Sequence, residues 1–146
     1  MKFKFSYQKL LDIKKKQEDQ KSLEVVAAED VLKKAKVNFE KLKLEKGSIL
    51  NQKFNKSTSP TTLMIANSYV YKINNKLEAQ KIKINKEETN LDKKRKELFE
   101  MTKSRKILDK LKESSFKKFM INETRKDQKE IDEISATISI KSKKDN

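Results

Sequence analysis

The stretch NKSTSPTT, residues Asn55–Thr62, is the one segment of the chain that clearly interrupts a helix. It holds the only proline of the 146 residues, and Ser59 directly before Pro60 has the form of a helix N-cap followed by the first helical residue. Proline is tolerated there because its missing N–H would have no partner inside the helix. We therefore expect one turn at about residues 56–60, with a helix on each side of it.

The rest of the chain has almost no turn-forming residues. It contains a single glycine, 40% of its residues are charged and 34% are hydrophobic. An average domain has roughly 7% glycine and 5% proline, largely for its turns. The chain is therefore either disordered, as its charge and low hydrophobicity also allow, or built from very few long helices.

Apolar residues in both halves repeat every seven positions, and this favours helices over disorder. One column of the second half is Leu63, Val70, Leu77, Ile84, Leu91 and Leu98, and its companion is Ala66, Ile73, Met101 and Leu108, with polar breaks at Gln80, Glu87 and Lys94. The first half has Val25, Leu32 and Phe39 in one column, and Ala28, Ala35, Leu42 and Ile49 in the other. Tyr7 and Leu11 extend this pattern backward across a polar gap at Lys14, Glu18 and Lys21. Such columns are typical of a coiled coil.

We predict an all-α fold, a long antiparallel two-helix coiled-coil hairpin that forms one domain over residues 1–146. The first helix covers about 3–55, the second covers about 61–140, and a disordered tail covers 141–146. Partners across the seam then have residue numbers that sum to about 116. Val25 meets Leu91, Leu32 meets Ile84, Phe39 meets Leu77, and Leu11 meets residues 105–108.

The second helix should extend beyond the first. Met1 would pair near residue 115, so that residues 116–140 project by about 37 Å at 1.5 Å per residue. An apolar stripe without an internal partner follows this segment: Phe116, Phe119, Met120, Ile131, Ile134 and Ile138. We interpret the stripe as a surface for another molecule, although self-association or folding back of the tail would also cover it.

The missing residue types argue against an enzyme. The chain has no Cys, His or Trp, and a two-helix hairpin offers no pocket in which acid, base and nucleophile converge. We therefore expect no catalytic residues, no metal and no cofactor. The longest apolar run is VVAA, residues 25–28, too short to span a bilayer, and lysines interrupt the apolar residues of the N-terminus, unlike a signal peptide. We expect a cytoplasmic protein.

The net charge of +15 raises the question of a polyanionic partner. Residues 1–56 hold 15 Lys and Arg against 8 Asp and Glu, and the remainder holds 22 against 14. The excess is thus divided between both halves, and only three basic residues are arginines, the residue on which base readout depends most. Weak binding to polyanions at low salt is expected, but no specific nucleic-acid function.

Three segments of the sequence resemble the FliJ family of flagellar export proteins. The stretch RKDQKEIDE, Arg125–Glu133, is similar to the C-terminal signature of that family, a basic residue followed by Asp-Gln and then Asp-Glu. The opening FKFSYQKLLDIKKKQED, which starts at Phe3, and the stretch YVYKINNKLEAQ, Tyr69–Gln80, resemble the family's first helix and the start of its second. Length, the single turn and the longer second arm agree with this resemblance.

The resemblance implies a soluble, non-enzymatic component of the flagellar type III export apparatus, peripherally associated with its cytoplasmic face at the inner membrane. Such proteins are similar to the stalk of rotary ATPases. They insert the end that carries both termini into the hexameric export ATPase and promote ring assembly. They also contact the cytoplasmic domain of the export gate and the export chaperones.

Carried over to this sequence, the resemblance implies two sets of contact residues. The ATPase-binding set is Arg125, Asp127, Gln128, Ile131, Asp132, Glu133 and Ile134; the set that faces the export gate is Tyr69, Ile73, Lys76 and Gln80. Ile73 also falls in the seam column, and Lys76 stands where the family usually has a small residue. Two alternatives remain open at this point: a self-associating structural coiled coil, and a basic hairpin that binds nucleic acid or a membrane surface. We expect the isolated chain to be a monomer.

Overall fold

The fold consists of two long helices. The computed structural model describes residues 1–55 and 59–145. Helix α1 covers Gln8–Asn55, 48 residues, and helix α2 covers Pro60–Lys144, 85 residues; the described residues contain no strand. The predicted all-α hairpin with a longer second helix is confirmed. The predicted turn lies largely outside the described residues.

The start of α2 has the predicted cap. The backbone N–H of Thr62 donates to Oγ of Ser59 at 3.3 Å, and the N–H of Leu63 donates to the carbonyl of Ser59 at 3.1 Å. These bonds satisfy two N–H groups that the first turn of a helix leaves without partners. Pro60 is the first helical residue, as the sequence predicts.

Helix α1 ends at Asn55, as predicted, but two helix ends differ from the predicted positions. Helix α1 begins at Gln8 rather than near residue 3, because the side chains of Phe3 and Phe5 are used for packing from a non-helical segment. Helix α2 continues to Lys144, through most of the segment predicted to be disordered. Its last turn carries Lys141, Lys143 and Lys144, and cations there stabilise the negative end of the helix dipole.

The described chain divides into two compact units. Unit 1 combines Met1–Gln17 with Thr102–Asn146, and unit 2 is Glu18–Met101. The single domain expected over residues 1–146 stays a prediction.

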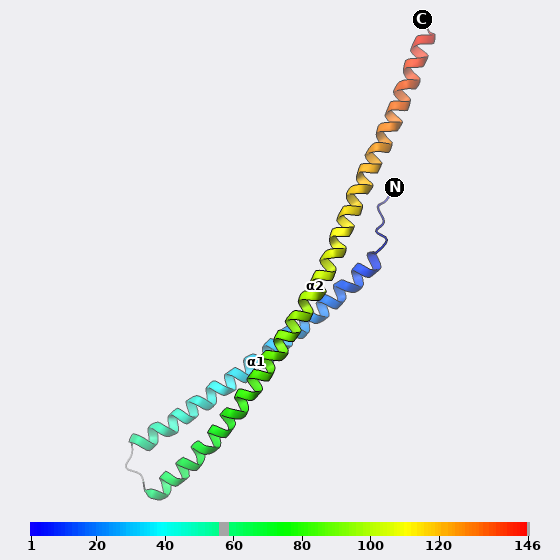
Figure 1. The fold of residues 1–146 in the computed structure, drawn as a ribbon. Helices are drawn as coiled ribbons and strands as arrows, with labels where there is room; N and C mark the ends of the chain where they lie inside the picture. Colours follow the sequence, from blue (N-terminus) through cyan, green and yellow to red (C-terminus); the bar gives the residue numbers. More distant parts are fainter. Residues whose placement is uncertain (56–58, 146) are drawn as a thin grey trace. The chain divides into compact units, whose positions relative to one another are not determined.

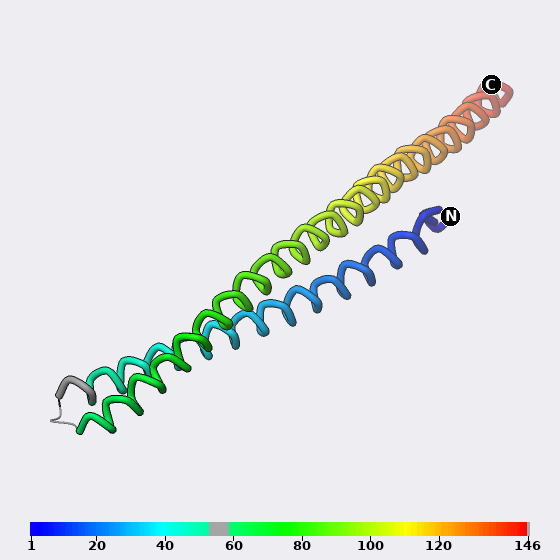
Figure 2. The backbone as a smooth tube through the Cα atoms, turned by 60° about the horizontal axis from the view of Figure 1, so that its bottom comes forward, coloured from blue at the N-terminus to red at the C-terminus, as the bar shows by residue number. Residues whose placement is uncertain are grey.

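In unit 2, α1 and α2 lie side by side and run antiparallel (Figures 1 and 2). Val25, Ala28 and Leu32 of α1 form one buried cluster with Leu91 of α2, and Ile84 and Leu98 pack against it. All six belong to the predicted heptad columns, and the cluster unites the predicted pairs Val25 with Leu91 and Leu32 with Ile84. Alanine lets the two helices approach closely, as at Ala35, of which 1% is exposed. The seam is therefore narrow.

A polar layer interrupts the seam of unit 2 at one end. Lys21 Nζ lies 2.7 Å from Oε2 of Glu97 and 3.0 Å from Oε2 of Glu24, and Lys94 Nζ lies 3.0 Å from the same Glu24 oxygen. The polar positions that break the two heptad patterns, Lys21 and Lys94, thus meet as a network of alternating charges.

In unit 1 the N-terminal residues pack along α2 from Thr102 to Phe119. Leu11 is fully buried, and 8% of Phe5 is exposed. The ring of Phe3 lies 5.2 Å from the ring of Phe116 and 5.6 Å from that of Phe119, measured between centroids. Phe3 and Phe5 are therefore packing residues of unit 1.

Candidate protein-binding surface

The C-terminal part of α2 is exposed along its whole length. Every residue from Thr124 to Asp145 is exposed, including Ile131, Ile134 and Ile138, at 56%, 60% and 62%. Residues 1–17, the other segment of unit 1, do not reach this part of the helix, which is drawn in orange and red in Figures 1 and 2. We call residues 124–145 the free segment.

The free segment begins later than the sequence predicts. Phe116 and Phe119 were assigned to the stripe without an internal partner, but Phe3 covers both. The reason is geometric: residues before Gln8 are not helical, and an extended chain advances about 3.3 Å per residue against 1.5 Å in a helix. The N-terminal residues therefore reach further along α2 than a helix would.

Glu123 is the last half-buried residue of α2 before the free segment. The pKa of the Glu123 carboxyl is lowered, first by the hydrogen bond from Lys126 at 3.0 Å and also by the positive charge of the N-terminal amine. The sequence predicts Met1 opposite residue 115, whereas the ring of Phe3 packs on Phe116 and Phe119, so the packed region extends past its predicted end.

The isoleucines of the free segment share one side of α2. At about 100° per residue, Ile131, Ile134 and Ile138 fall within an arc of about 60°. Asp127 lies inside the same arc, whereas Ile140 lies on the far side. Three exposed branched side chains in a row make a narrow apolar stripe, with a carboxylate at its N-terminal end.

The polar residues of the predicted ATPase-binding set lie next to this stripe. Gln128 Nε2 donates to Oδ1 of Asp132 at 2.9 Å, which fixes both side chains on one edge of the stripe. Arg125 falls on the same edge, about 120° from Ile131. Glu133 points about 160° away from Ile131. Six of the seven predicted residues thus share one half of the helix surface, and Glu133 lies on the other half.

The residues predicted to face the export gate are divided between the surface and the seam. Ile73 is a seam residue with 2% of its surface exposed, and the half-buried Gln80 donates from Nε2 to the carbonyl of Ala35 at 2.9 Å. Tyr69 is 46% exposed and donates its hydroxyl to Glu45 at 2.6 Å; this hydrogen bond raises the pKa of Tyr69. Lys76 is exposed. Only Tyr69 and Lys76 present whole side chains to a partner.

One comparison with known proteins gives a match. The family described as flagellar FliJ protein matches residues 3–144, nearly the whole chain. The chain belongs to the FliJ family. No curated protein and no solved structure matches it.

Membership in the FliJ family gives the chain a role in flagellar export, as a non-catalytic component. The match includes Arg125–Glu133, the signature stretch, which occupies the first half of the free segment. In this FliJ-family chain, none of the described helices is long and apolar enough to cross a membrane. The residues from 1 to 55 and from 59 to 145 bring no three acidic side chains together as a candidate metal site.

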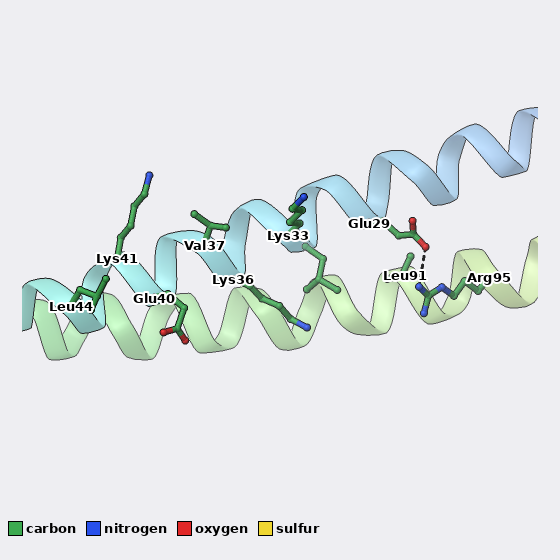
Figure 3. Close-up of a pocket in the computed structure, with 10 residues that line it drawn as sticks. Glu29, Lys33, Lys36, Val37, Glu40, Lys41, Leu44, Leu91 and Arg95 are labelled. Carbon is green, nitrogen blue, oxygen red and sulfur yellow. Dashed lines mark hydrogen bonds and ion pairs between the residues drawn. The ribbon is translucent and has the colours of Figure 1, made fainter.

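A shallow groove of about 490 Å³ on unit 2 is a surface feature that the sequence did not indicate. Val37 and Leu44 line it together with the buried Leu91, and the ion pair between Glu29 and Arg95, at 2.9 Å, closes one end (Figure 3). Val37 and Leu44 lie seven residues apart but outside the two heptad columns, a spacing that could have revealed them. The groove of this FliJ-family chain is lined by apolar side chains together with Lys, Arg and Glu side chains.

Proposed function

We propose that the chain acts as a stalk of the hexameric flagellar export ATPase. Its free segment enters the centre of the ring, promotes ring assembly and raises ATPase activity. Two findings support the proposal: the family match, which gives a role in flagellar export, and a helical segment with exposed isoleucines that nothing else in its unit covers. The proposal depends mainly on this exposed helical segment.

The free segment suits the narrow centre of a ring. A single α-helix with its side chains is about 10–12 Å wide, narrower than two packed helices. The isoleucine stripe supplies apolar area, and the Gln128–Asp132 edge supplies hydrogen-bonding groups already held in place. Residues of this kind give an interface its directional contacts, while the apolar side chains exclude water around them.

The proposal includes further partners on unit 2. Tyr69 and Lys76, exposed near the start of α2, contact the cytoplasmic domain of the export gate. Ile73 and Gln80 contribute by holding this part of α2 against α1. Export chaperones bind as well, and the chain works on the cytoplasmic face of the export apparatus at the inner membrane.

A double substitution in the free segment tests the ATPase contact. Gln128→Ala with Asp132→Ala should lower stimulation of the ATPase by roughly fivefold or more, because truncating central contact residues costs about 1–2 kcal/mol. Helicity by circular dichroism should not change, since alanine is the best helix former and both residues are exposed.

Asp30→Ala with Lys34→Ala is the matched control. It removes another exposed i,i+4 pair, 2.9 Å apart, from α1 in unit 2, outside the free segment. The control should stimulate the ATPase like the parent chain. If the Gln128/Asp132 variant also stimulates fully, the free segment does not make the proposed contact.

A further inference from the structure

The positive charge of the chain is concentrated in the packed part of unit 1. Residues 1–17 and 102–120 hold thirteen Lys and Arg against three Asp and Glu, a net charge of +10 in 36 residues. Unit 2 holds eighteen against thirteen, a net charge of +5 in 84 residues. We call residues 1–17 and 102–120 the basic collar. Its two segments come from different halves of the chain, so the net charge of each half does not reveal the collar.

The charge of α2 changes where the collar ends. Residues 121–145 hold six basic and six acidic side chains and are neutral. The collar and the free segment are consecutive parts of the same helix, but only the collar attracts anions over a distance. A partner that receives both parts must therefore offer two zones of different charge.

Lysines of the collar point outward on both of its sides. On α2, Lys103 and Lys110 lie about 140–160° around the helix from the half-buried Leu108. On α1, Lys9 and Lys16 lie about 140–160° around the helix from the buried Leu11. All four are exposed. Because these two outer surfaces face away from each other, one flat surface cannot contact both.

A groove on the collar is also lined by cations. It has a volume of about 630 Å³, with Phe3 and Phe5 beside Lys4, Lys9 and Lys112, and none of its lining residues is acidic. A side chain that combines a carboxylate with an apolar stem fits this lining. The collar is thus suited to acidic protein side chains on more than one side.

Two other polyanions fit the collar less well. Specific readout of nucleic acid relies most on arginine, and only one of the thirteen basic residues of the collar, Arg105, is an arginine. An anionic membrane is locally flat and would use the lysines of one side only. A partner that surrounds the collar uses both.

We propose that the basic collar is surrounded by an acidic zone of the inner wall of the export ATPase ring, next to the zone that receives the free segment. This inference rests on the proposed function. Attraction between the collar and the ring wall raises the rate of entry, and the free segment supplies the specific contacts. The partner surface is thereby defined by its chemistry, as a ring of Asp and Glu side chains.

Three pairs of substitutions test the collar, each with two Lys→Gln changes seven residues apart. Lys9→Gln with Lys16→Gln changes the α1 side, and Lys103→Gln with Lys110→Gln changes the α2 side. Lys86→Gln with Lys93→Gln, at exposed positions of unit 2, is the control with the same loss of charge. The association rate of each full-length chain with the purified ATPase is measured across a salt series.

Each collar pair should slow association by about threefold at low salt, and the four changes together should slow it by about tenfold. The control pair should have no effect, and added salt should reduce the difference between the variants and the parent chain. The Gln128/Asp132 variant should keep the parent's salt dependence while it stimulates less, so the two proposals can fail separately.

Three results would overturn the inference. An effect of only one collar pair would indicate a flat partner. An equal effect of the control pair would indicate a response to net charge alone. Binding to vesicles of anionic phospholipid that depends on the collar lysines, together with unchanged association with the ATPase, would assign the collar to a membrane surface.

Discussion

Lys21 contacts two carboxylates at a place where the seam would otherwise be apolar. The hydrogen bond that Lys21 donates to Glu97, followed by the one that it donates to Glu24, raises the pKa of Lys21. The hydrogen bond from Lys21 is also the main cause that lowers the pKa of Glu24 and of Glu97. A mispaired register would leave these charges half-buried without partners, which is costly. The layer therefore favours one alignment of α1 against α2.

The polar layer predicts how the stability of unit 2 depends on pH. The carboxyl groups of Glu24 and Glu97 have lower pKa values in the folded chain than their ordinary value of 4.5. Their contribution to stability is therefore complete above pH 4.5 and is lost as the pH falls through the pKa values of the folded chain. The raised pKa of Lys21 gives stability that is present below 10.5 and is lost as pH rises through the folded value. Urea unfolding should therefore show a plateau between about pH 5 and pH 10.

Glu97→Gln should reduce the loss of stability at acidic pH, the acid limb of this profile. It removes a carboxylate whose protonation breaks the ion pair with Lys21. Glu88→Gln, which disrupts the more exposed pair with Lys36 at 3.2 Å, should leave the acid limb unchanged, since exposed ion pairs contribute little. Identical acid limbs in both variants would show that the polar layer does not set the pH dependence.

Helix α2 is held by different contacts along its length. Up to Phe119 it packs on residues from the first part of the chain, and beyond Glu123 its side chains are exposed. A single helix of this length has little stability of its own in water. The contacts of Phe3 with Phe116 and Phe119 are therefore the last ones that support the free segment from inside the molecule.

Two truncations of α2 separate packing from binding. A chain that ends after Glu123 should unfold cooperatively at the same temperature as the full chain, since it keeps every contact of Phe3. A chain that ends after Ser115 should unfold at a lower temperature, because it loses both phenylalanines that Phe3 packs against. Thermal unfolding followed by circular dichroism measures both.

Equal unfolding temperatures for the two truncated chains would mean that Phe3 contributes no stability through these rings. Both truncated chains should also fail to stimulate the ATPase, because both lack the free segment.

The charge distribution of the whole molecule bears on self-association. If two copies paired their isoleucine stripes in parallel, their basic collars, each with a net charge of +10, would lie close together. Like charges that lie close together repel strongly at low salt. Three isoleucines also provide far less area than the roughly 1,200 Å² of a stable interface.

Sedimentation at micromolar concentration and physiological salt should therefore give the mass of a monomer, 17.2 kDa. Replacing Ile131, Ile134 and Ile138 by serine should leave that mass unchanged and should weaken binding to the ATPase. A dimer that these three substitutions dissociate would support the alternative of a self-associating coiled coil.

The sequence by itself determined the helices, the cap at Ser59–Pro60 and the seam columns of unit 2. These features depend on local signals, a proline after a capping residue and apolar side chains every seven positions. It also indicated the stripe of Ile131, Ile134 and Ile138, because a helical repeat can be read without knowing its partner.

Only the tertiary structure decided where the packed region ends, and which charges come together. Residues before Gln8 are not helical, and Phe3 packs on Phe116 and Phe119, beyond residue 115 at which the packed region was expected to end. Folding also places residues 1–17 beside 102–120, which turns two separate basic segments into one collar. Both outcomes depend on contacts between residues about a hundred positions apart, and the spacing of residues along the chain does not contain that information.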